Sequence, residues 1–402
     1  MTTSKPAHFQ FPLAIIGNLF EHYDKALYGL LAPFIAPLFF PKSSYIVALI
    51  LAYLPYGILL QPLTFYLLGR KTSLKQILLF SLLGMSVVTL AIGCIPTFES
   101  IGILAPILLA TLRALQNLFA SIESASAPLF LLDNTTRKQR DFMSSLYEMS
   151  SQAGVILASL LITTLLLTGT ISHYWRYLFI LGGGAGSIGL ILRYLRLEES
   201  PIKEFPKLSR SDLIPIVRIA AVTGFICLNY LFIMELTNSY VPLISTLTIE
   251  SMMILHLGLS LFDFLLLPLF SIAAKKIGRD RLMKGCAFAI ALLAIPFISL
   301  LSSPSWNTIL LVRFTFICLG LGCAVSYQNW CRDVATGSNR FFTLAIGKMV
   351  GKKIISDPAI SISLLLFHNL GSHYPISIYL ALIALLSITA VQPNLNKYFI
   401  RH

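Results

Sequence analysis

Charged residues are scarce in this sequence of 402 residues, and their scarcity excludes a soluble globular protein. Only 12% of the residues are Asp, Glu, Lys or Arg, and 56% are hydrophobic. Soluble domains carry about 25% charged residues. The mean hydropathy is +0.80. A chain of this composition is predicted to be an all-α protein that crosses a membrane many times.

Acidic residues are especially few, with 17 Asp and Glu against 30 Lys and Arg, so the formal net charge is +13. In a soluble protein such an excess would suggest nucleic-acid binding. Here the basic residues gather in short clusters between apolar runs, where they set topology and attract anionic lipid. We therefore expect the lipid bilayer as a partner and no nucleic acid.

Motifs for metals, cofactors and catalysis are missing as well. The six cysteines are scattered through apolar segments, without a Cys-x-x-Cys pair or a His at metal-ligand spacing. They are expected to pack as small apolar residues. The run Gly182–Gly184 lies within an apolar stretch, so it predicts close helix packing and no phosphate loop. We expect no metal, no cofactor and no enzyme activity.

Twelve apolar stretches are present that can cross a bilayer, which requires about 20 residues each. They are expected at residues 11–40, 44–68, 75–96, 101–132, 141–169, 175–197, 213–246, 251–274, 283–301, 308–331, 341–368 and 375–392. The gap after the sixth stretch is the charged one. It predicts a six-helix bundle over 1–200, a cytoplasmic linker over 201–212 and a second six-helix bundle over 213–402.

The basic residues predict the orientation of these stretches. With the N-terminus inside, nearly all basic residues between the stretches fall on the cytoplasmic side, and only Lys42 and Arg176 fall outside. The positive-inside rule then places both termini in the cytoplasm. Two Gly-Arg pairs, Gly69-Arg70 and Gly278-Arg279, lie about half a chain apart, which fits two repeated halves.

The first stretch is unusual because its middle carries Glu21, His22, Asp24 and Lys25. Ionisable groups inside a bilayer are costly and usually face a polar cavity. At about 100° per residue, a single helix face holds Glu21, Asp24, Lys25 and Tyr28. Two interpretations remain open. Glu21 and Lys25 can form an internal pair that holds the helix in its bundle, or the face is a proton or substrate site at mid-membrane.

Arg113 lies near the middle of the fourth stretch, with Gln116 one turn away on the same face. One interpretation is a structural arginine bonded to backbone carbonyls. The other is a fixed cation for a substrate carboxylate, which the forked guanidinium suits. Glu123 lies about 15 Å further along the helix, close to the cytoplasmic face, and is expected to act in gating or packing.

The eleventh stretch contains Lys348, Lys352, Lys353 and Asp357. Lys353 and Asp357 have the i,i+4 spacing of an ion pair, which leaves Lys352 uncompensated. We expect Lys352 to face the cavity and, with Arg113, to favour an anionic group on the substrate. Lys348 can instead extend its amine toward the cytoplasm.

Three isolated acids occur in other apolar stretches, namely Glu148, Glu235 and Asp263. Each lacks a basic partner on its own helix, and an unpaired buried acid is a candidate for carrying a proton. The sequence does not single out one of them.

The segment GNLFEHYDKALYG at 17–29 resembles the first helix of the metabolite:proton symporters, a branch of the major facilitator superfamily. This branch includes proline/betaine, α-ketoglutarate, citrate and shikimate permeases. The matching positions are Gly17, Asn18, Glu21, Tyr23, Asp24, Tyr28 and Gly29. The fourth stretch matches at Arg113, Leu115, Gln116 and Glu123, and the exit of the sixth matches at Glu198-Glu199-Ser200-Pro201. The second half resembles the family mainly in its pattern of spans.

The resemblance implies the major facilitator fold and proton-coupled uptake of a small organic acid or zwitterion. Transport would proceed by alternating access between two bundles of a monomer in the inner membrane. The implied proton-coupling residues are Glu21 and Asp24, and the implied substrate-binding residues are Tyr28, Arg113, Gln116 and Lys352. Two alternatives are a transport-inactive sensor on the same fold and a membrane-embedded enzyme, for which no His/Asp or Ser/His cluster is visible.

The superfamily's cytoplasmic loop motif is only partly present. Phe65, Tyr66 and Leu67 stand where the family has Gly, Asp and Arg, while Gly69, Arg70 and Lys71 match. Together with Glu123 and Arg279, these three matching residues are the expected gating group. The missing acid argues against the usual cytoplasmic latch, although not against the fold.

Overall fold

The computed structural model describes residues 11–41, 48, 51, 60–71, 73–196, 210–302, 304–335, 339–370 and 374–391. The first half comprises α1 (Phe11–Phe39), α3 (Leu60–Lys71), α4 (Leu74–Cys94), the short α5 (Phe98–Ile101), α6 (Leu104–Asp133), α7 (Arg140–Leu167) and α8 (Ile171–Arg196). Within these described ranges the first half is helical apart from the turns that join the helices.

The second half has three interrupted helices among its spans. It comprises α9 (Arg210–Tyr230), η2 (Leu231–Leu236), α10 (Thr237–Ile244), α11 (Ile249–Ile277), α12 (Arg279–Ser299), η3 (Leu300–Ser302), α13 (Trp306–Ala324), α14 (Tyr327–Val334), α15 (Arg340–Met349), η4 (Val350–Ser356), α16 (Pro358–Leu370) and α17 (Tyr374–Ala390). The segments η2 and η4 are π-helical turns inside long helices. Such turns often occur at functional sites.

The predicted all-helical membrane architecture is confirmed. Among the described residues, eight helices are long and apolar enough to cross a membrane. The first stretch and the stretch over 340–370 carry several charges in their central turns, which lowers their apolar character. Most of the second stretch lies outside the described residues, as does most of the predicted linker at 201–212, and α9 begins within that linker, at Arg210. The division at 200 and 213 therefore stays a prediction.

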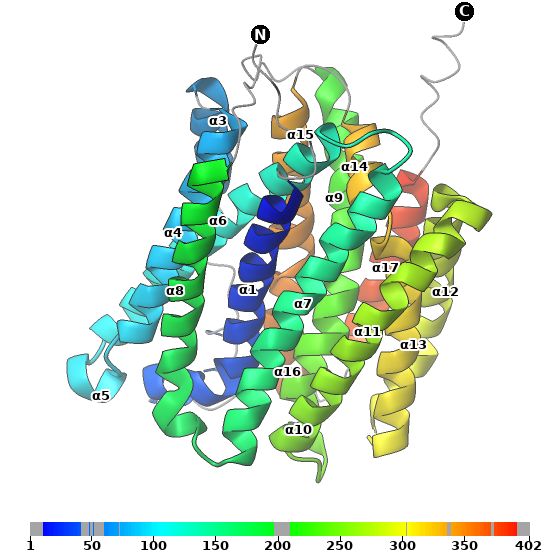
Figure 1. The fold of residues 1–402 in the computed structure, drawn as a ribbon. Helices are drawn as coiled ribbons and strands as arrows, with labels where there is room; N and C mark the ends of the chain where they lie inside the picture. Colours follow the sequence, from blue (N-terminus) through cyan, green and yellow to red (C-terminus); the bar gives the residue numbers. More distant parts are fainter. Residues whose placement is uncertain are drawn as a thin grey trace, which may run out of the picture.

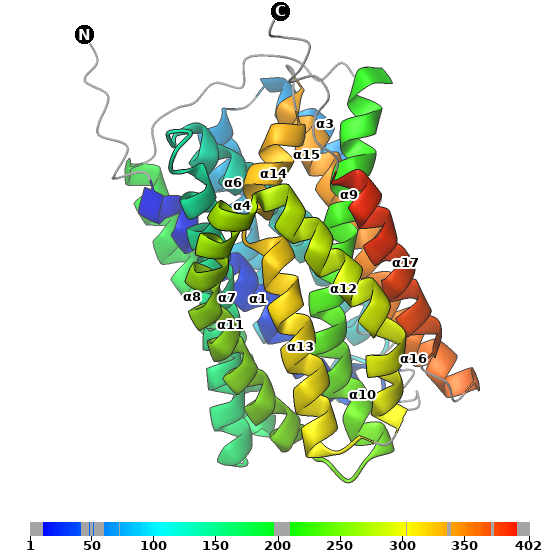
Figure 2. The same ribbon diagram turned by 90° about the vertical axis from the view of Figure 1, so that its right-hand side faces the viewer.

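The helices form one bundle of long, roughly aligned rods (Figure 1). The start of α1 and the end of α17 lie at the same end of this bundle, and α5 and α10 lie at the other (Figures 1 and 2). In the first half α1 packs on α7 and α8, and in the second half α9 packs on α15, η4 and α17. The halves meet where α7 contacts α11 and where α15 contacts α3 and α6.

Small residues allow the helices around α1 to pack closely. A Cβ at Gly154 of α7 would lie 2.2 Å from the backbone oxygen of Leu19, so α1 and α7 touch there through backbone. A Cβ at Gly183 of α8 would lie 2.7 Å from the backbone oxygen of Ser86 in α4. Gly184 has open space in front of it. The predicted packing role of the glycine run thus applies to only part of it.

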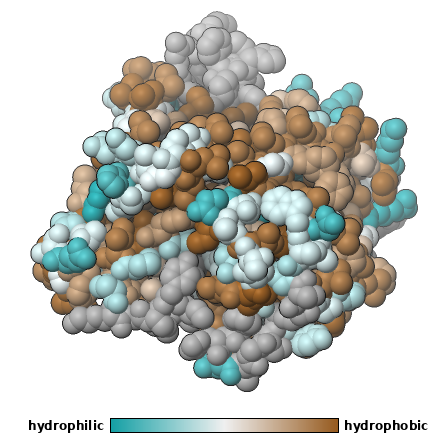
Figure 3. Space-filling model, turned by 90° about the horizontal axis from the view of Figure 1, so that it is seen from below, coloured by the Kyte–Doolittle hydropathy of each residue, from teal (hydrophilic) through white to brown (hydrophobic). Residues whose placement is uncertain are grey.

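The outside of the bundle is apolar, as a lipid-facing surface requires. Leu181, Ile188 and Leu265 are exposed by 58%, 62% and 68%. Seen from the end that carries α5 and α10, the face is mostly hydrophobic, with hydrophilic patches near its centre and along its edge (Figure 3).

Candidate functional site

A cavity of about 320 Å³ lies between the two halves. This volume is in the range of small-molecule sites. It is lined by α1, α6 and α7 of the first half and by α9, η2, α11, α13, α14, α15, η4 and α16 of the second. Its charged lining residues are Lys25, Arg113, Glu148, Glu235, Lys348, Lys352, Lys353 and Asp357. A ligand in this position would contact both halves at once.

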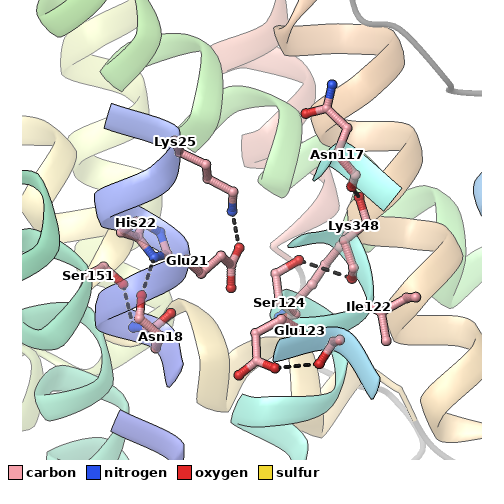
Figure 4. A network of polar contacts seen from close by, with 12 residues as sticks. Asn18, Glu21, His22, Lys25, Asn117, Ile122, Glu123, Ser124, Ser151 and Lys348 are labelled. Atoms are coloured by element: carbon pink, nitrogen blue, oxygen red, sulfur yellow. Dashed lines mark hydrogen bonds and ion pairs between the residues drawn. The ribbon is translucent and has the colours of Figure 1, made fainter. Parts of the chain in front are cut away.

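The charged turn of α1 faces in more than one direction. Glu21 is fully buried and forms an ion pair with Lys25 (Figure 4). The side chain of Lys25 borders the cavity. Asp24 is buried and absent from the cavity wall, because it lies about 100° around the helix from Lys25. His22 lines the cavity and contacts the backbone oxygen of Asn18 through Nδ1 at 3.0 Å. The two predicted proton-coupling acids therefore occupy different environments.

Asp24 is connected to the cavity by a chain of hydrogen bonds through α4 and α6. The hydroxyl of Thr89 donates to Asp24 Oδ2 at 2.6 Å, and Gln116 Nε2 donates to Thr89 Oγ1 at 3.0 Å. Arg113 Nη1 donates to Gln116 Oε1 at 2.5 Å. Arg113 lines the cavity, whereas Gln116 is buried behind it. A change at Asp24 can thus reach Arg113 through two intermediate side chains.

The guanidinium of Arg113 is held in orientation by Tyr28. Its Cζ atom lies 3.5 Å from the centre of the Tyr28 ring, within cation–π range. Tyr28 lines the cavity, although only 1% of its surface is exposed to solvent. Arg113 therefore has a stacking partner from α1 and a hydrogen-bond partner from α6. A ligand in the cavity can bind to the remaining N–H groups of its guanidinium.

The lysines of α15 and η4 have three different environments. Lys353 donates to Asp357 at 2.5 Å, as the spacing predicted, and to Asn117 of α6 at 2.9 Å. Lys348 points toward α6, where it donates to the backbone oxygen of Ser124 at 2.9 Å (Figure 4). Lys352 lines the cavity and has no acid within ion-pair distance among the described residues.

Glu235 of η2 is the acidic counterpart of Lys352 in the cavity wall. It has no cation within ion-pair distance in the described part of the chain. It approaches α1 at Gly29, where a Cβ would lie 3.0 Å from Glu235 Oε2. The matching glycine of the first helix therefore makes room for a carboxylate of the other half. The cavity thus presents a positive and a negative group that have no ion-pair partner among the described residues.

Glu123 has a packing role in this conformation. It is fully buried and forms a two-pronged ion pair with Arg193 of α8, at 2.5 and 2.9 Å. The hydroxyl of Ser81 in α4 donates to it at 2.7 Å. A Cβ at Gly17 would lie 1.7 Å from Arg193 Nη2, so a glycine is needed there. Arg193 is 0% exposed, so this ion pair is buried between the helices.

The other predicted gating residues are not all described. Gly69, Arg70 and Lys71 lie in α3, but their side chains are outside the described residues. Arg279 pairs with Asp280 at 3.1 Å and with Asp333 of α14 at 3.0 Å, both within the second half. It therefore joins α12 to α14 and does not bridge the halves.

The two halves are bridged by other groups at the end where α1 begins. Asp133, at the end of α6, pairs with Arg332 of α14 at 2.8 Å and with Arg340 of α15 at 3.2 Å. Asn329 donates to Asp141 of α7 at 2.5 Å. We call these five residues the interhalf latch. The latch could not be predicted from the sequence, because an acid and its partners about 200 positions away leave no local pattern.

An aromatic contact is made one residue before Tyr66, which stands at the position of the family's loop acid. Phe65 of α3 packs edge to face on Phe341 of α15, with ring centres 6.5 Å apart. Closer to the cavity, Gln328 of α14 links Lys348 to Glu148 of α7, through bonds of 2.7 and 2.8 Å. Polar and aromatic contacts therefore close the cavity on this side.

No cluster of His, Cys, Asp and Glu that could hold a metal ion occurs among the described residues. The charged and hydrogen-bonding side chains of the cavity wall supply its chemistry. This arrangement can bind a small polar molecule and can exchange protons with its buried carboxyl groups.

Comparison with known proteins identifies relatives by sequence and by fold. The sequence profile of the Major Facilitator Superfamily matches residues 14–351. A putative proline/betaine transporter of Staphylococcus aureus is 31% identical over 246 residues, which are 56% of this chain and 53% of that protein. A glycine betaine/proline/ectoine/pipecolic acid transporter of Dickeya dadantii is 34% identical over 210 residues, which are 50% of this chain and 42% of that protein. The matches thus span about half the length of these curated relatives.

Solved structures share the fold over almost the whole chain. A D-xylose–proton symporter is 14% identical, with a TM-score of 0.71, and the alignment covers 96% of this chain and 98% of that chain. A human organic anion transporter is 13% identical, with a TM-score of 0.70, and covers 97% and 100%. At these identities the likeness concerns the fold alone.

Proposed function

The chain belongs to the Major Facilitator Superfamily, and from this premise we propose that it is a secondary active transporter for proton-coupled uptake of a small organic zwitterion. The two halves would rock about the cavity and expose it to each side of the membrane in turn. The names of the curated relatives, which are transporters of proline, betaine and related molecules, support this class.

The observation that carries the proposal is the pair of unpaired charges in the cavity. Lys352 lacks an acid and Glu235 lacks a cation within ion-pair distance in the described residues, and both line the space between the halves. Leaving such groups unpaired is costly unless a ligand compensates them. A zwitterion supplies one charge of each sign. Its carboxylate would bind Arg113 and Lys352, and its cationic group would bind Glu235.

We propose that Asp24 carries the coupled proton and that Glu21 does not. Glu21 is already engaged in an ion pair with Lys25 on the same helix. Asp24 has no cation within ion-pair distance among the described residues and accepts from Thr89. A proton on Asp24 would convert an acceptor into a donor. The hydrogen bonds of Thr89 and Gln116 would then rearrange and move Arg113, which links proton binding to substrate binding.

We further propose that this conformation is closed to the cytoplasm. The interhalf latch lies at the end where α1 begins, and the basic clusters assign that end to the cytoplasm. On this basis both termini face the cytoplasm and the protein lies in the inner membrane. A monomer suffices, because a single chain supplies the whole cavity wall.

The proposal is tested by transport in proteoliposomes that contain the purified protein. Radiolabelled glycine betaine, proline and α-ketoglutarate are offered with an inward proton gradient, with and without a protonophore. We expect the zwitterions to accumulate and the protonophore to abolish accumulation. Accumulation of α-ketoglutarate alone would contradict the zwitterion assignment. Binding in a thermal-shift assay without accumulation would instead indicate the sensor.

A further inference from the structure

Asp263 is a buried carboxyl group with no role in the cavity described so far. It lies in α11 of the second half and is 0% exposed. Its Oδ1 atom accepts from the hydroxyl of Tyr230 at 3.3 Å, and its Oδ2 atom has no hydrogen-bond partner. No Lys, Arg or His lies within ion-pair distance of it in the described part of the chain.

In the described part of the chain, the titratable groups near Asp263 on the surrounding helices supply no positive charge. They are Tyr230 of α9, Glu148 of α7 and Cys318 of α13. An ionised carboxylate without a partner costs several kcal/mol in a protein interior. The neutral acid avoids most of this cost. The carboxyl group of Asp263 is therefore expected to hold a proton in this conformation.

Polar atoms connect Asp263 to the cavity. Tyr230 lines the cavity and reaches Asp263 through its hydroxyl. On the same face of α11, Ser260 lies three residues before Asp263 and His256 seven residues before it. His256 also lines the cavity, and both its Nε2 atom and the Ser260 hydroxyl lack hydrogen-bond partners. Buried polar atoms of this kind usually bind ordered water.

We propose that Asp263 is a proton-binding site of the second half, loaded from the cavity through the hydroxyl of Tyr230. A proton from cavity water adds to the Tyr230 oxygen while the tyrosine passes its own proton to the Asp263 carboxylate. Tyrosine is thus unchanged and the carboxylate becomes neutral. The proposal rests on proton-coupled transport and extends it, because it adds a proton site in the second half to Asp24 in the first.

The first test measures the proton directly and does not depend on transport. Infrared difference spectra of the protein in lipid are recorded while the pH is stepped, for wild type, Asp263→Asn and the control Glu250→Gln. Glu250 is an exposed acid at the start of the same helix. We expect one carboxylic-acid C=O band of the wild type to be missing in Asp263→Asn and present in Glu250→Gln. Identical bands in all three proteins would overturn the proposal.

A second variant covers the case in which Asp263→Asn does not fold. Tyr230→Phe keeps the carboxyl group and removes only the hydroxyl that bonds to it. We expect it to keep the same C=O band at a shifted frequency, because the acid loses one hydrogen bond. A band at the wild-type position would contradict the assigned contact and the route through Tyr230.

The transport test uses glycine betaine in proteoliposomes whose membrane potential is clamped at zero. Each coupled proton contributes about tenfold accumulation per pH unit of gradient. Asp263→Asn should lower accumulation by about tenfold per unit and leave exchange of labelled for unlabelled glycine betaine intact. Wild-type accumulation in the variant would overturn the proposal. Failure of the wild type to accumulate would count against the transport function, while the infrared spectra still decide whether Asp263 binds a proton.

Discussion

Arg113→Lys tests whether the guanidinium in the cavity binds a substrate carboxylate. Arg113 stacks on Tyr28 at 3.5 Å and donates to Gln116 at 2.5 Å, which fixes the plane of the fork. Lysine keeps the charge but cannot hold Gln116 and form two parallel hydrogen bonds to a carboxylate. One charge-assisted bond is worth about 1–3 kcal/mol. The dissociation constant for a zwitterion should therefore rise roughly 5- to 150-fold.

A matched control is available at the other end of the first half. Arg176 also stacks on an aromatic ring, that of Trp175 at 4.5 Å, and donates to the backbone oxygens of Gly93 and Ile95. It does not line the cavity. Arg176→Lys should therefore lower the thermal stability of the protein without changing its affinity for substrate.

The assay is isothermal titration of glycine betaine into each purified variant, together with its thermal unfolding curve. Arg113→Lys should weaken the binding of glycine betaine by more than the change in the protein's thermal stability explains. Unchanged affinity in Arg113→Lys would show that the arginine is structural. Equal losses of affinity in Arg113→Lys and Arg176→Lys would trace the effect to folding and refute the carboxylate site.

Three other predictions concern coupling, substrate charge and gating. Asp24→Asn should lower gradient-driven accumulation by about tenfold per pH unit and retain exchange, because the amide keeps the shape but cannot carry a proton; wild-type accumulation by this variant would remove Asp24 from the mechanism. Lys352→Met should raise the KM for uptake of a dicarboxylate more than the KM for uptake of a zwitterion. Glu235→Gln should raise the KM for uptake of the zwitterion only. Equal effects on both substrates would contradict the assigned charges. Asp133→Asn should open the cavity to the cytoplasm, so that a cysteine in the cavity reacts faster with a thiol reagent added on the cytoplasmic side. Asp280→Asn, which removes an ion pair within one half, should not change that rate.

Much of the first helix could be predicted from the sequence. Glu21 and Lys25 pair as their i,i+4 spacing predicted, and so do Lys353 and Asp357. Tyr28, Arg113 and Lys352 all border the cavity. These features depend on helical periodicity, which is local and visible in a single sequence.

The contacts of two acids could not be predicted, because their partners are distant in the chain. Asp24 bonds to Thr89, 65 positions away, and Glu123 pairs with Arg193, 70 positions away. Arg193 lies near the end of a span, and its partners are not visible in the local sequence. The tertiary structure buries it against Glu123 of α6 and the backbone oxygen of Leu78 in α4.

The sequence by itself determined that the chain is a multi-span helical protein with ionisable groups inside the membrane, since composition and hydrophobic length impose this on any fold. It also determined which charges on one helix can neutralise each other. Only the tertiary structure decided which charges remain unpaired. Lys352 and Glu235 belong to different helices, and Asp263 is isolated because none of the described helices packed around it brings a cation within ion-pair distance. Whether a buried charge is compensated depends on distances of a few ångströms between helices, and these distances are set by packing.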